Sequence, residues 1–319
     1  MTGSKGMRRP ASACPAPDRS ETTRGNFERF SDVPRGTASN ERPKVNFKPF
    51  LREVFRMRID HVYHLDLHRE DIEGAKVALL PGDPFRVPGI GDEMKKRYGV
   101  EGREVSWKRE YRTFRFSVGG EPVLAVSTGI GGPSASIAVE ELAMLGVRVF
   151  VRVGTTGAIR KDVRVGEVVV TTGSVRLDGA SGHYAPPEFP AVAHHEVVNA
   201  LLEGCRKEGV GFHAGITASS DTFYPGQERE DSFTGYVPRR FRGSMEEWRR
   251  LGVLNYEMES ATILTMTAAM GLKGGCVTGV VVNRCAGEGI TADDLALGER
   301  NAVRAAVASI EDLVAKGER

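Results

Sequence analysis

The sequence has no apolar run long enough to span a membrane or to form the core of a secretory signal. It has only four cysteines, Cys14, Cys205, Cys276 and Cys285, and their spacing fits neither a zinc site nor a disulfide framework. A formal net charge of only +2 gives the chain as a whole no reason to bind a polyanion. These absences predict a cytoplasmic protein with reduced thiols that binds neither membranes nor nucleic acids.

Positive charge is concentrated in residues 1–58, which hold 13 Lys and Arg against 6 Asp and Glu and leave about −5 for the remainder. This segment is rich in Ser, Thr, Pro, Gly and Arg and has no sustained apolar period, which predicts a disordered basic extension. Its acidic residues, among them Asp18 and Glu21, argue against an organellar transit peptide. Residues 59–319 are then expected to form a single domain.

The glycine motifs of common nucleotide-binding sites are also absent. The glycine-rich stretch from Thr128 to Pro133 has neither the G-x-G-x-x-G spacing nor a G-K-[ST] ending, which excludes a dinucleotide fingerprint and a P-loop. It leads into a helix predicted to begin at Ser134. Backbone N–H groups at such a helix start favour an anion or a small polar ligand.

What the sequence does contain is an alternation of apolar runs and helical periods. Strands are expected at residues 76–80, 113–117, 122–127, 148–153, 167–172, 213–218, 253–256 and 275–282. Helices are expected at residues 134–145, 192–207, 244–252, 259–270 and 293–316, the third of them starting with a capping box at Ser244. This order predicts an α/β fold with a mixed, largely parallel central sheet and helices on both faces.

Polar residues cluster at or just past the expected strand ends, where ligands bind in sheets of this kind. They are Arg86, Thr155, Gln227, Arg229, Glu257, Glu259 and Arg284. A further arginine, Arg152, lies inside a strand that its pattern predicts to be buried on both faces, so its charge must be paired. Its partner is either a structural carboxylate or a bound anion.

The loop that follows residues 213–218 carries an aromatic pair, a Pro-Gly turn and then Gln227 and Arg229. An amide offers a donor beside an acceptor, and a guanidinium offers a fork of donors, so together they suit the O=C–N–H–C=O edge of a pyrimidine. A polar surface loop is the alternative interpretation of this stretch taken alone.

Several motifs occurring in order resemble the hexameric nucleoside phosphorylase family. They are Pro81-Gly-Asp-Pro84, Ser127-Thr-Gly-Ile-Gly-Gly-Pro-Ser134, Arg152-Val-Gly-Thr-Thr-Gly157, Phe223-Tyr-Pro-Gly-Gln-Glu-Arg229 and Asn255-Tyr-Glu-Met-Glu-Ser260. The resemblance covers about residues 61–314, and the Gln-Glu-Arg loop is similar to the uridine-specific branch of the family. It implies a homo-oligomer, a hexamer built of dimers, although the sequence does not decide between a hexamer and a dimer.

The resemblance also implies roles for individual residues. Phosphate would be bound by Gly82, Arg86, Arg152, Thr155 and, from a partner subunit, Arg109. Ribose would be bound by Glu257, Met258, Glu259 and, from a partner subunit, His64. The base would stack on Phe223 and pair with Gln227 and Arg229, while Glu110, Ile130 and Ser134 match positions that bind a monovalent cation, K⁺, between subunits. Catalysis would rest on Arg152, Gln227, Arg229 and Glu259.

The implied activity is that of a pentosyltransferase: the reversible phosphorolysis of uridine to uracil and ribose 1-phosphate in pyrimidine salvage. Inorganic phosphate is the co-substrate, and this chemistry requires no cofactor. A purine nucleoside phosphorylase acting on inosine is disfavoured because Asn283-Arg284 stands where purine members place an Asp. A nucleosidase would not need the arginine cluster, and a non-catalytic nucleoside-binding relative would not need the intact Arg, Gln and Glu set. One stretch, Cys285 to Gly289, is richer in glycine than the family pattern and leaves substrate breadth open.

Overall fold

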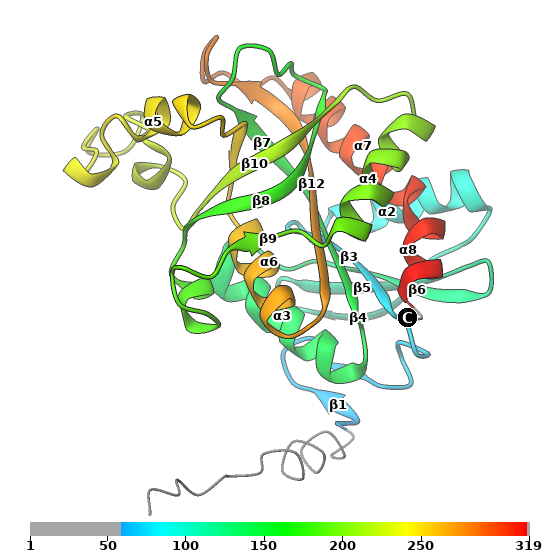
Figure 1. Ribbon diagram of the computed structural model, residues 1–319. Coiled ribbons are helices and arrows are strands. Elements are labelled where there is room, and N and C mark those ends of the chain that lie inside the picture. The colour runs from blue at the N-terminus through cyan, green and yellow to red at the C-terminus, as the bar shows by residue number, and fades with distance from the viewer. Residues whose placement is uncertain (1–58, 318–319) are drawn as a thin grey trace, which may run out of the picture. The chain divides into compact units, whose positions relative to one another are not determined.

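The computed structural model describes residues 59–317 (Figure 1). The predicted basic extension, residues 1–58, lies outside the described residues. The strands of the main sheet are β3 (Val77–Pro81), β4 (Arg103–Lys108), β5 (Tyr111–Val118), β6 (Glu121–Val126), β7 (Val149–Ala158), β8 (Val168–Leu177), β9 (Ala191–Val192), β10 (Phe212–Ser220), β11 (Asn255–Glu257) and β12 (Lys273–Asn283). A separate hairpin pairs β1 (His61–Val62) with β2 (Leu67–His68).

The strand order is β11-β10-β8-β12-β7-β3-β6-β5-β4, with β9 added beside β8. Strand β11 also pairs with β7, which closes β7, β12, β8, β10 and β11 into a ring. The pairs β10–β11, β8–β10, β7–β12, β3–β6 and β3–β7 are parallel, whereas β7–β11, β8–β12, β4–β5, β5–β6 and β8–β9 are antiparallel.

The prediction of a mixed α/β fold is confirmed, but the sheet is not largely parallel. Strands β7 and β8 are joined by a short loop without a crossover helix, so β8 runs against β7 and against its own neighbour β12. The hairpin strands β4, β5 and β6 add two more antiparallel pairs at one edge. Apolar β-branched runs cannot distinguish these pairings, because a buried strand has the same pattern in either direction.

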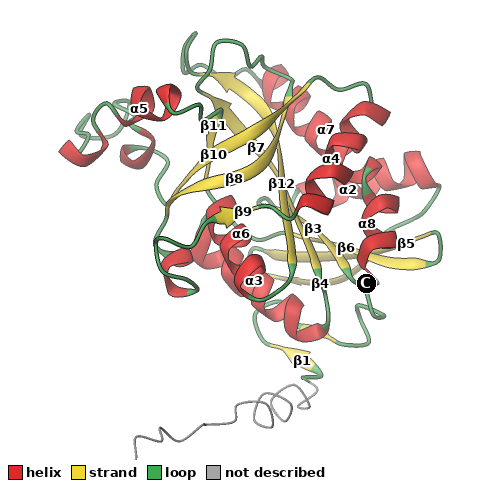
Figure 2. Cartoon of the chain, in the orientation of Figure 1, coloured by secondary structure: helices red, strands yellow, loops and turns green. Residues whose placement is uncertain are grey.

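Helices cover both faces, as predicted (Figure 2). One layer contains α2 (Arg86–Tyr98), α4 (His195–Lys207), α7 (Ala292–Ala308) and α8 (Ile310–Gly317), and the other contains α3 (Gly132–Leu145) and α6 (Ser260–Ala269). Alternate residues of β3 show the division: Val77 and Leu79 pack with the first layer, and Ala78 and Leu80 with the second. Among residues 59–317, no helix has both the length and the apolar character needed to cross a membrane.

Several elements differ from the predictions, and strand β4 was not predicted. Helix α2 was not predicted, because Pro88, Gly89 and Gly91 lower its propensity, although the buried spacing of Ile90 and Met94 is helical. The last predicted helix is broken at Ser309 into α7 and α8. Strand β7 continues to Ala158, so Thr155 lies inside a strand rather than just past its end.

The predicted capping box at Ser244 is wrong. Gly243, at φ 79°, is the residue before α5 (Ser244–Arg250), and no side chain of α5 caps its own helix start. Instead, Glu228 accepts hydrogen bonds from the backbone N–H groups of Gly243 and, at 2.7 Å, Met245. A carboxylate at this end complements the partial positive charge of the helix. Glu228 therefore attaches α5 to the loop that carries Gln227 and Arg229.

Candidate active site

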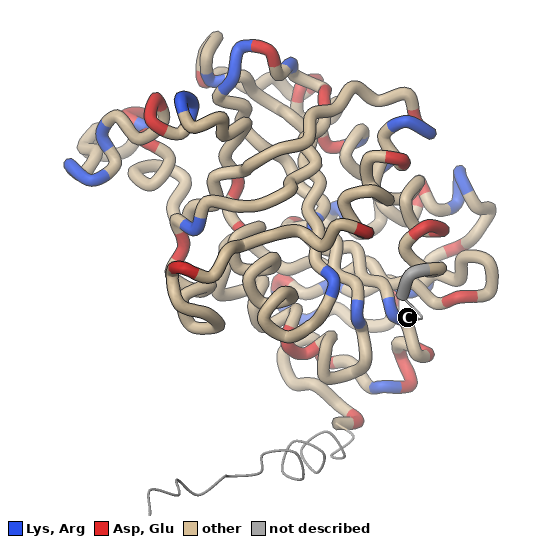
Figure 3. Tube along the Cα trace, viewed as in Figure 1, with Lys and Arg blue, Asp and Glu red and all other residues tan. Residues whose placement is uncertain are grey.

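A cleft of about 470 Å³ opens beside β7, β11 and β12. Its lining includes eleven residues that the sequence singled out: Gly82, Arg86, Ile130, Arg152, Thr155, Phe223, Gln227, Arg229, Glu257, Met258 and Glu259. They come from stretches up to about 180 residues apart in the chain, so only the fold brings them together. In the view of Figure 3, basic and acidic residues are interspersed along the trace. The lining of the cleft likewise combines both signs, with three arginines and the acidic residues Asp83, Glu257 and Glu259.

Arg152 lines the cleft, and its side chain is 7% exposed. Its Nε donates to Oε2 of Glu257 at 2.7 Å, and its Nη2 lies 2.5 Å from Oε2 of Glu259. The sequence left open whether Arg152 pairs with a structural carboxylate or with a bound anion. Within the protein, its partners are two carboxylates. Burial opposes the charged form of Arg152, but the two carboxylates outweigh it and raise its pKa.

The third guanidinium nitrogen of Arg152 is different. Its Nη1 is buried and has no hydrogen-bond partner among residues 59–317. It faces the turn at Gly82, where an added Cβ would lie 3.9 Å from this nitrogen and 3.2 Å from the carbonyl oxygen of Gly129. A glycine at this position keeps a side chain away from Nη1, and an unpaired charged donor on a residue that lines a cleft is suited to an anion.

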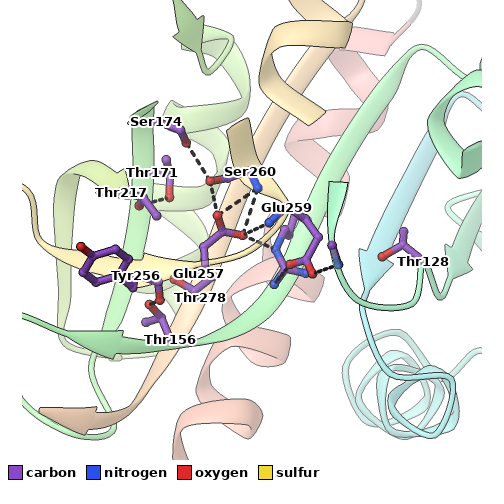
Figure 4. Close-up of polar contacts among 12 residues, drawn as sticks. Thr128, Thr156, Thr171, Ser174, Thr217, Tyr256, Glu257, Glu259, Ser260 and Thr278 are labelled. Carbon is purple, nitrogen blue, oxygen red and sulfur yellow. Dashed lines mark hydrogen bonds and ion pairs between the residues drawn. The ribbon is translucent and has the colours of Figure 1, made fainter. Parts of the chain in front are cut away.

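The two glutamates differ in their surroundings (Figure 4). Glu257 accepts from the backbone N–H groups of Glu259 and Ser260 at 2.9 and 3.0 Å and from Ser260 Oγ at 2.5 Å. These bonds cap the start of α6. Burial raises the pKa of Glu257, but Arg152 and these hydrogen bonds outweigh it, and the net pKa is lowered. Both of its oxygens are engaged inside the protein, so Glu257 is better suited to holding Arg152 than to contacting a ribose.

Glu259 has fewer internal partners. Its Oε1 accepts from the backbone N–H of Gly131 at 2.6 Å, and its Oε2 lies beside Arg152. Burial raises its pKa, Arg152 opposes this, and repulsion from Glu257 adds to it, so the net pKa lies above the ordinary range. Glu259 is therefore the carboxylate of the pair that retains capacity for a ligand.

One end of the cleft is built from the turn after β3 and the start of α2. Gly129 donates through its backbone N–H to the carbonyl of Gly82 at 2.9 Å, which holds the glycine-rich loop against this turn. Arg86 begins α2, and its Nε lies 3.1 Å from Oε1 of Glu299 on α7. Together with Nη1 of Arg152, these groups form the positively charged end of the cleft.

The other end is built from the loop after β10 and the end of β12. Gln227 is 3% exposed, and its backbone carbonyl oxygen accepts from Nη1 of Arg284 at 2.9 Å. The guanidinium carbon of Arg229 lies 4.2 Å from the ring centroid of Phe223. Burial and repulsion from Arg284 lower the pKa of Arg229, while Glu288 opposes this change. Two planar hydrogen-bonding side chains and an aromatic ring are thus close together, as the sequence predicted.

His64 and Arg109 do not line this cleft. His64 lies at a second hollow, where its Nδ1 is 2.6 Å from Oε1 of Glu141. Arg109 lies in the turn between β4 and β5 at φ 56°. Their predicted contribution to a neighbouring subunit's site stays a prediction.

The predicted cation residues are partly brought together. Ser134 Oγ donates to Oε1 of Glu110 at 3.2 Å and also to the carbonyl of Thr128. Ile130 is exposed and lies at the cleft. Within the described part of the chain, no group of three or more His, Cys, Asp or Glu side chains is arranged to hold a metal ion.

Sequence reasoning missed the carboxylates that hold the cleft arginines, Glu288 and Glu299, and the apolar wall of Tyr256, Val281, Val282, Ile290 and Leu295. Glu288 lies only four residues after Arg284, but residues 284–288 form a turn and loop rather than a helix, so this spacing gave no reliable signal of the contact. The apolar wall gave no signal either, because its residues resemble any core position.

Comparison with known proteins agrees with this geometry. The family model described as "Phosphorylase superfamily" matches residues 76–315. A uridine phosphorylase of Escherichia coli is 53% identical over 253 residues, which is 79% of this chain and 98% of that protein. A uridine phosphorylase of Thermococcus kodakarensis is 44% identical, covering 71% of this chain and 79% of that protein. A guanosine phosphorylase of Halorubrum lacusprofundi is 34% identical, covering 72% and 88%.

The resemblance drawn from the motifs is thereby confirmed at the level of the family. The matched region contains nearly all of the described strands and helices and every residue that lines the cleft. The chain belongs to the phosphorylase superfamily.

Proposed function

We propose that this protein is a pentosyltransferase that catalyses the reversible phosphorolysis of uridine to uracil and ribose 1-phosphate. The observation that carries the proposal is the cleft itself. It has arginine donors at the Gly82 end, Gln227 and Arg229 at the other end, and Glu259 between them. Relatives that are 44% to 53% identical are uridine phosphorylases, which supports the same assignment.

At the positively charged end, a phosphate would accept from Nη1 of Arg152 and from Arg86 and would lie against Gly82 and Thr155. One phosphate oxygen would form a bond to C1′ of the ribose as the C1′–N1 bond breaks, with inversion at C1′. The electron pair of that bond goes to the base, which leaves as an anion. Holding both reactants in line replaces an encounter in water by a prearranged one.

The carboxylate of Glu259 would accept from the two vicinal hydroxyls of the ribose and stabilise positive charge at C1′. Gln227 and Arg229 would stabilise the negative charge that develops on the uracil, while Phe223 contacts the base. Glu257 would keep Arg152 and Glu259 in place, because its own oxygens are engaged at the start of α6.

No observation favours the purine alternative. Asn283, which stands where purine members would place an Asp, donates through its amide to the carbonyls of Arg160 and Val163 at 2.9 and 2.6 Å. It does not line the cleft. The test is incubation with uridine, inosine and thymidine, with and without phosphate, while free base is measured. Release of uracil that requires phosphate supports the proposal, and release from inosine alone overturns the choice of base.

The remaining parts of the proposal concern assembly and setting. His64 and Arg109 would complete the cleft of a neighbouring subunit in a homo-hexamer built of dimers. K⁺ would bind between subunits at Glu110, Ser134 and Ile130, where the contact between Glu110 and Ser134 supplies two side-chain oxygens close together. The enzyme would act in the cytoplasm in pyrimidine salvage. Its substrates would be small molecules, with neither nucleic acid nor membrane as a partner.

A further inference from the structure

Glu288 lies in Cys285 to Gly289, the stretch that departs from the family pattern, and its carboxylate contacts two arginines at the base end of the cleft. Its Oε2 pairs with Nη1 of Arg229, and its Oε1 accepts from Nε of Arg284 at 2.7 Å. Arg284 in turn donates to the carbonyl of Gln227. One carboxylate thus contacts the Arg229 side chain directly and, through Arg284, supports the backbone that carries Gln227.

The contact constrains the orientation of the Arg229 guanidinium. Its Nη1 is engaged by Glu288, and one face of its guanidinium lies over the ring of Phe223. Its Nε is buried and has no hydrogen-bond partner in the part of the chain that the structure describes. A guanidinium is planar, so holding Nη1 and one face also sets the direction of the N–H at Nε. That N–H remains for a ligand.

The contact also balances charge. Arg229 is 5% and Arg284 6% exposed, and two guanidiniums so close together and so poorly hydrated repel each other. Glu288 contacts both arginines, although its own side chain is 38% exposed. Without a carboxylate between them, Arg229 would be expected to turn away from Arg284, and its Nε would leave the cleft.

We propose that Glu288 is a positioning residue for base recognition, which it performs by holding the guanidinium of Arg229 with Nε directed at the uracil edge. This inference rests on the proposed function. The alternative is an ordinary exposed ion pair, and such pairs contribute little to stability or activity.

The test compares Glu288→Gln with the wild-type enzyme in steady-state kinetics, varying uridine and phosphate separately. The variant keeps the length of the side chain and loses its charge. We expect kcat/KM for uridine to fall about tenfold while KM for phosphate changes less than about twofold. Glu246→Gln is the matched control, since Glu246 also pairs with two arginines, Arg249 and Arg250, but on the exposed face of α5. It should behave as wild type.

A double-mutant cycle separates positioning from a general structural effect. In an Arg229→Ala background, Glu288→Gln should cause no further loss, because the residue through which it acts is gone. An equal loss in both backgrounds, or a rise in KM for phosphate alone, would overturn the inference, as would unchanged kinetics of the single variant. If wild-type protein releases no uracil from uridine and phosphate, the proposed function fails, and this inference fails with it.

Discussion

Nη2 of Arg152 lies 2.5 Å from Oε2 of Glu259 in a part of the molecule where both side chains are almost fully buried. The pair joins the residue expected to bind phosphate to the residue expected to bind ribose. The positions of the two side chains therefore depend on each other, and a substitution of one changes the surroundings of the other.

Arg152→Ala should abolish phosphorolysis and also destabilise the fold. It leaves the carboxylates of Glu257 and Glu259 buried without their cation, a change that typically costs about 3 to 5 kcal/mol. The loss of stability is expected because Arg152 is paired with two carboxylates inside the protein as well as lining the cleft. Thermal unfolding and activity are measured together. Arg152→Met combined with Glu259→Gln should recover part of the lost Tm without activity, and a normal Tm for Arg152→Ala would contradict this account.

Activity should fall on the acidic side at a pH above the ordinary glutamate range. The pKa of Glu259 is raised by burial, and only its charged form accepts from both ribose hydroxyls. As pH decreases through this raised pKa, kcat/KM for uridine decreases. The same shift stabilises the folded protein at low pH, and that stability is lost as pH rises through the folded pKa. The pH profile of kcat/KM is the measurement. Glu259→Gln should lack this acidic limb at a much lower rate, and an identical limb in the variant would exclude Glu259 as its source.

Gln227→Leu should weaken binding of the base and leave phosphate binding unchanged. An apolar side chain of similar size leaves the base edge without its partner, at a typical cost of about 1 to 3 kcal/mol. The contact from Arg284 goes to the backbone carbonyl of Gln227, so it survives the substitution. Binding of uracil and of phosphate is measured by calorimetry. A loss confined to phosphate would show that the loop has been assigned to the wrong end of the cleft.

Mixing two inactive variants should restore activity if the site is shared between subunits. Arg109 lies outside the cleft of its own chain, whereas Glu259 lies within it. Co-assembled Arg109→Ala and Glu259→Gln subunits would form some sites with both residues intact. Glu259→Gln is chosen rather than Arg152→Ala because it leaves no unpaired buried carboxylate. Activity of the mixture is compared with that of each variant alone, and a mixture as inactive as its components would mean that each subunit has a complete site.

Removal of residues 1–58 should leave an active oligomer, because this segment has no apolar set to contribute to a core. Size-exclusion chromatography and the uracil-release assay of the truncated protein test this expectation. Aggregation or dissociation would show that the segment packs against the rest of the chain.

The family, most strands and helices, and most polar residues that line the cleft were accessible from the sequence, because each depends on local patterns or on motifs in a fixed order. Arg152 illustrates the limit of that reasoning. Its place in a buried strand required a partner, but a carboxylate and a bound anion satisfy the same requirement. The structure shows that both can apply, since two of its nitrogens face glutamates and the third faces the cleft.

Direction and pairing of strands were decided only by the tertiary structure. A buried β-branched run has the same pattern in a parallel and an antiparallel pair, so β8 gave no sign that it would run against β12. The same holds for Glu228, Glu288 and Glu299. Each is an ordinary glutamate in sequence and acquires its role by meeting a helix start or an arginine that lies between 4 and 213 residues away in the chain. The sequence determined which chemical groups are present, and the fold determined which of them meet, because a contact depends on distance in space.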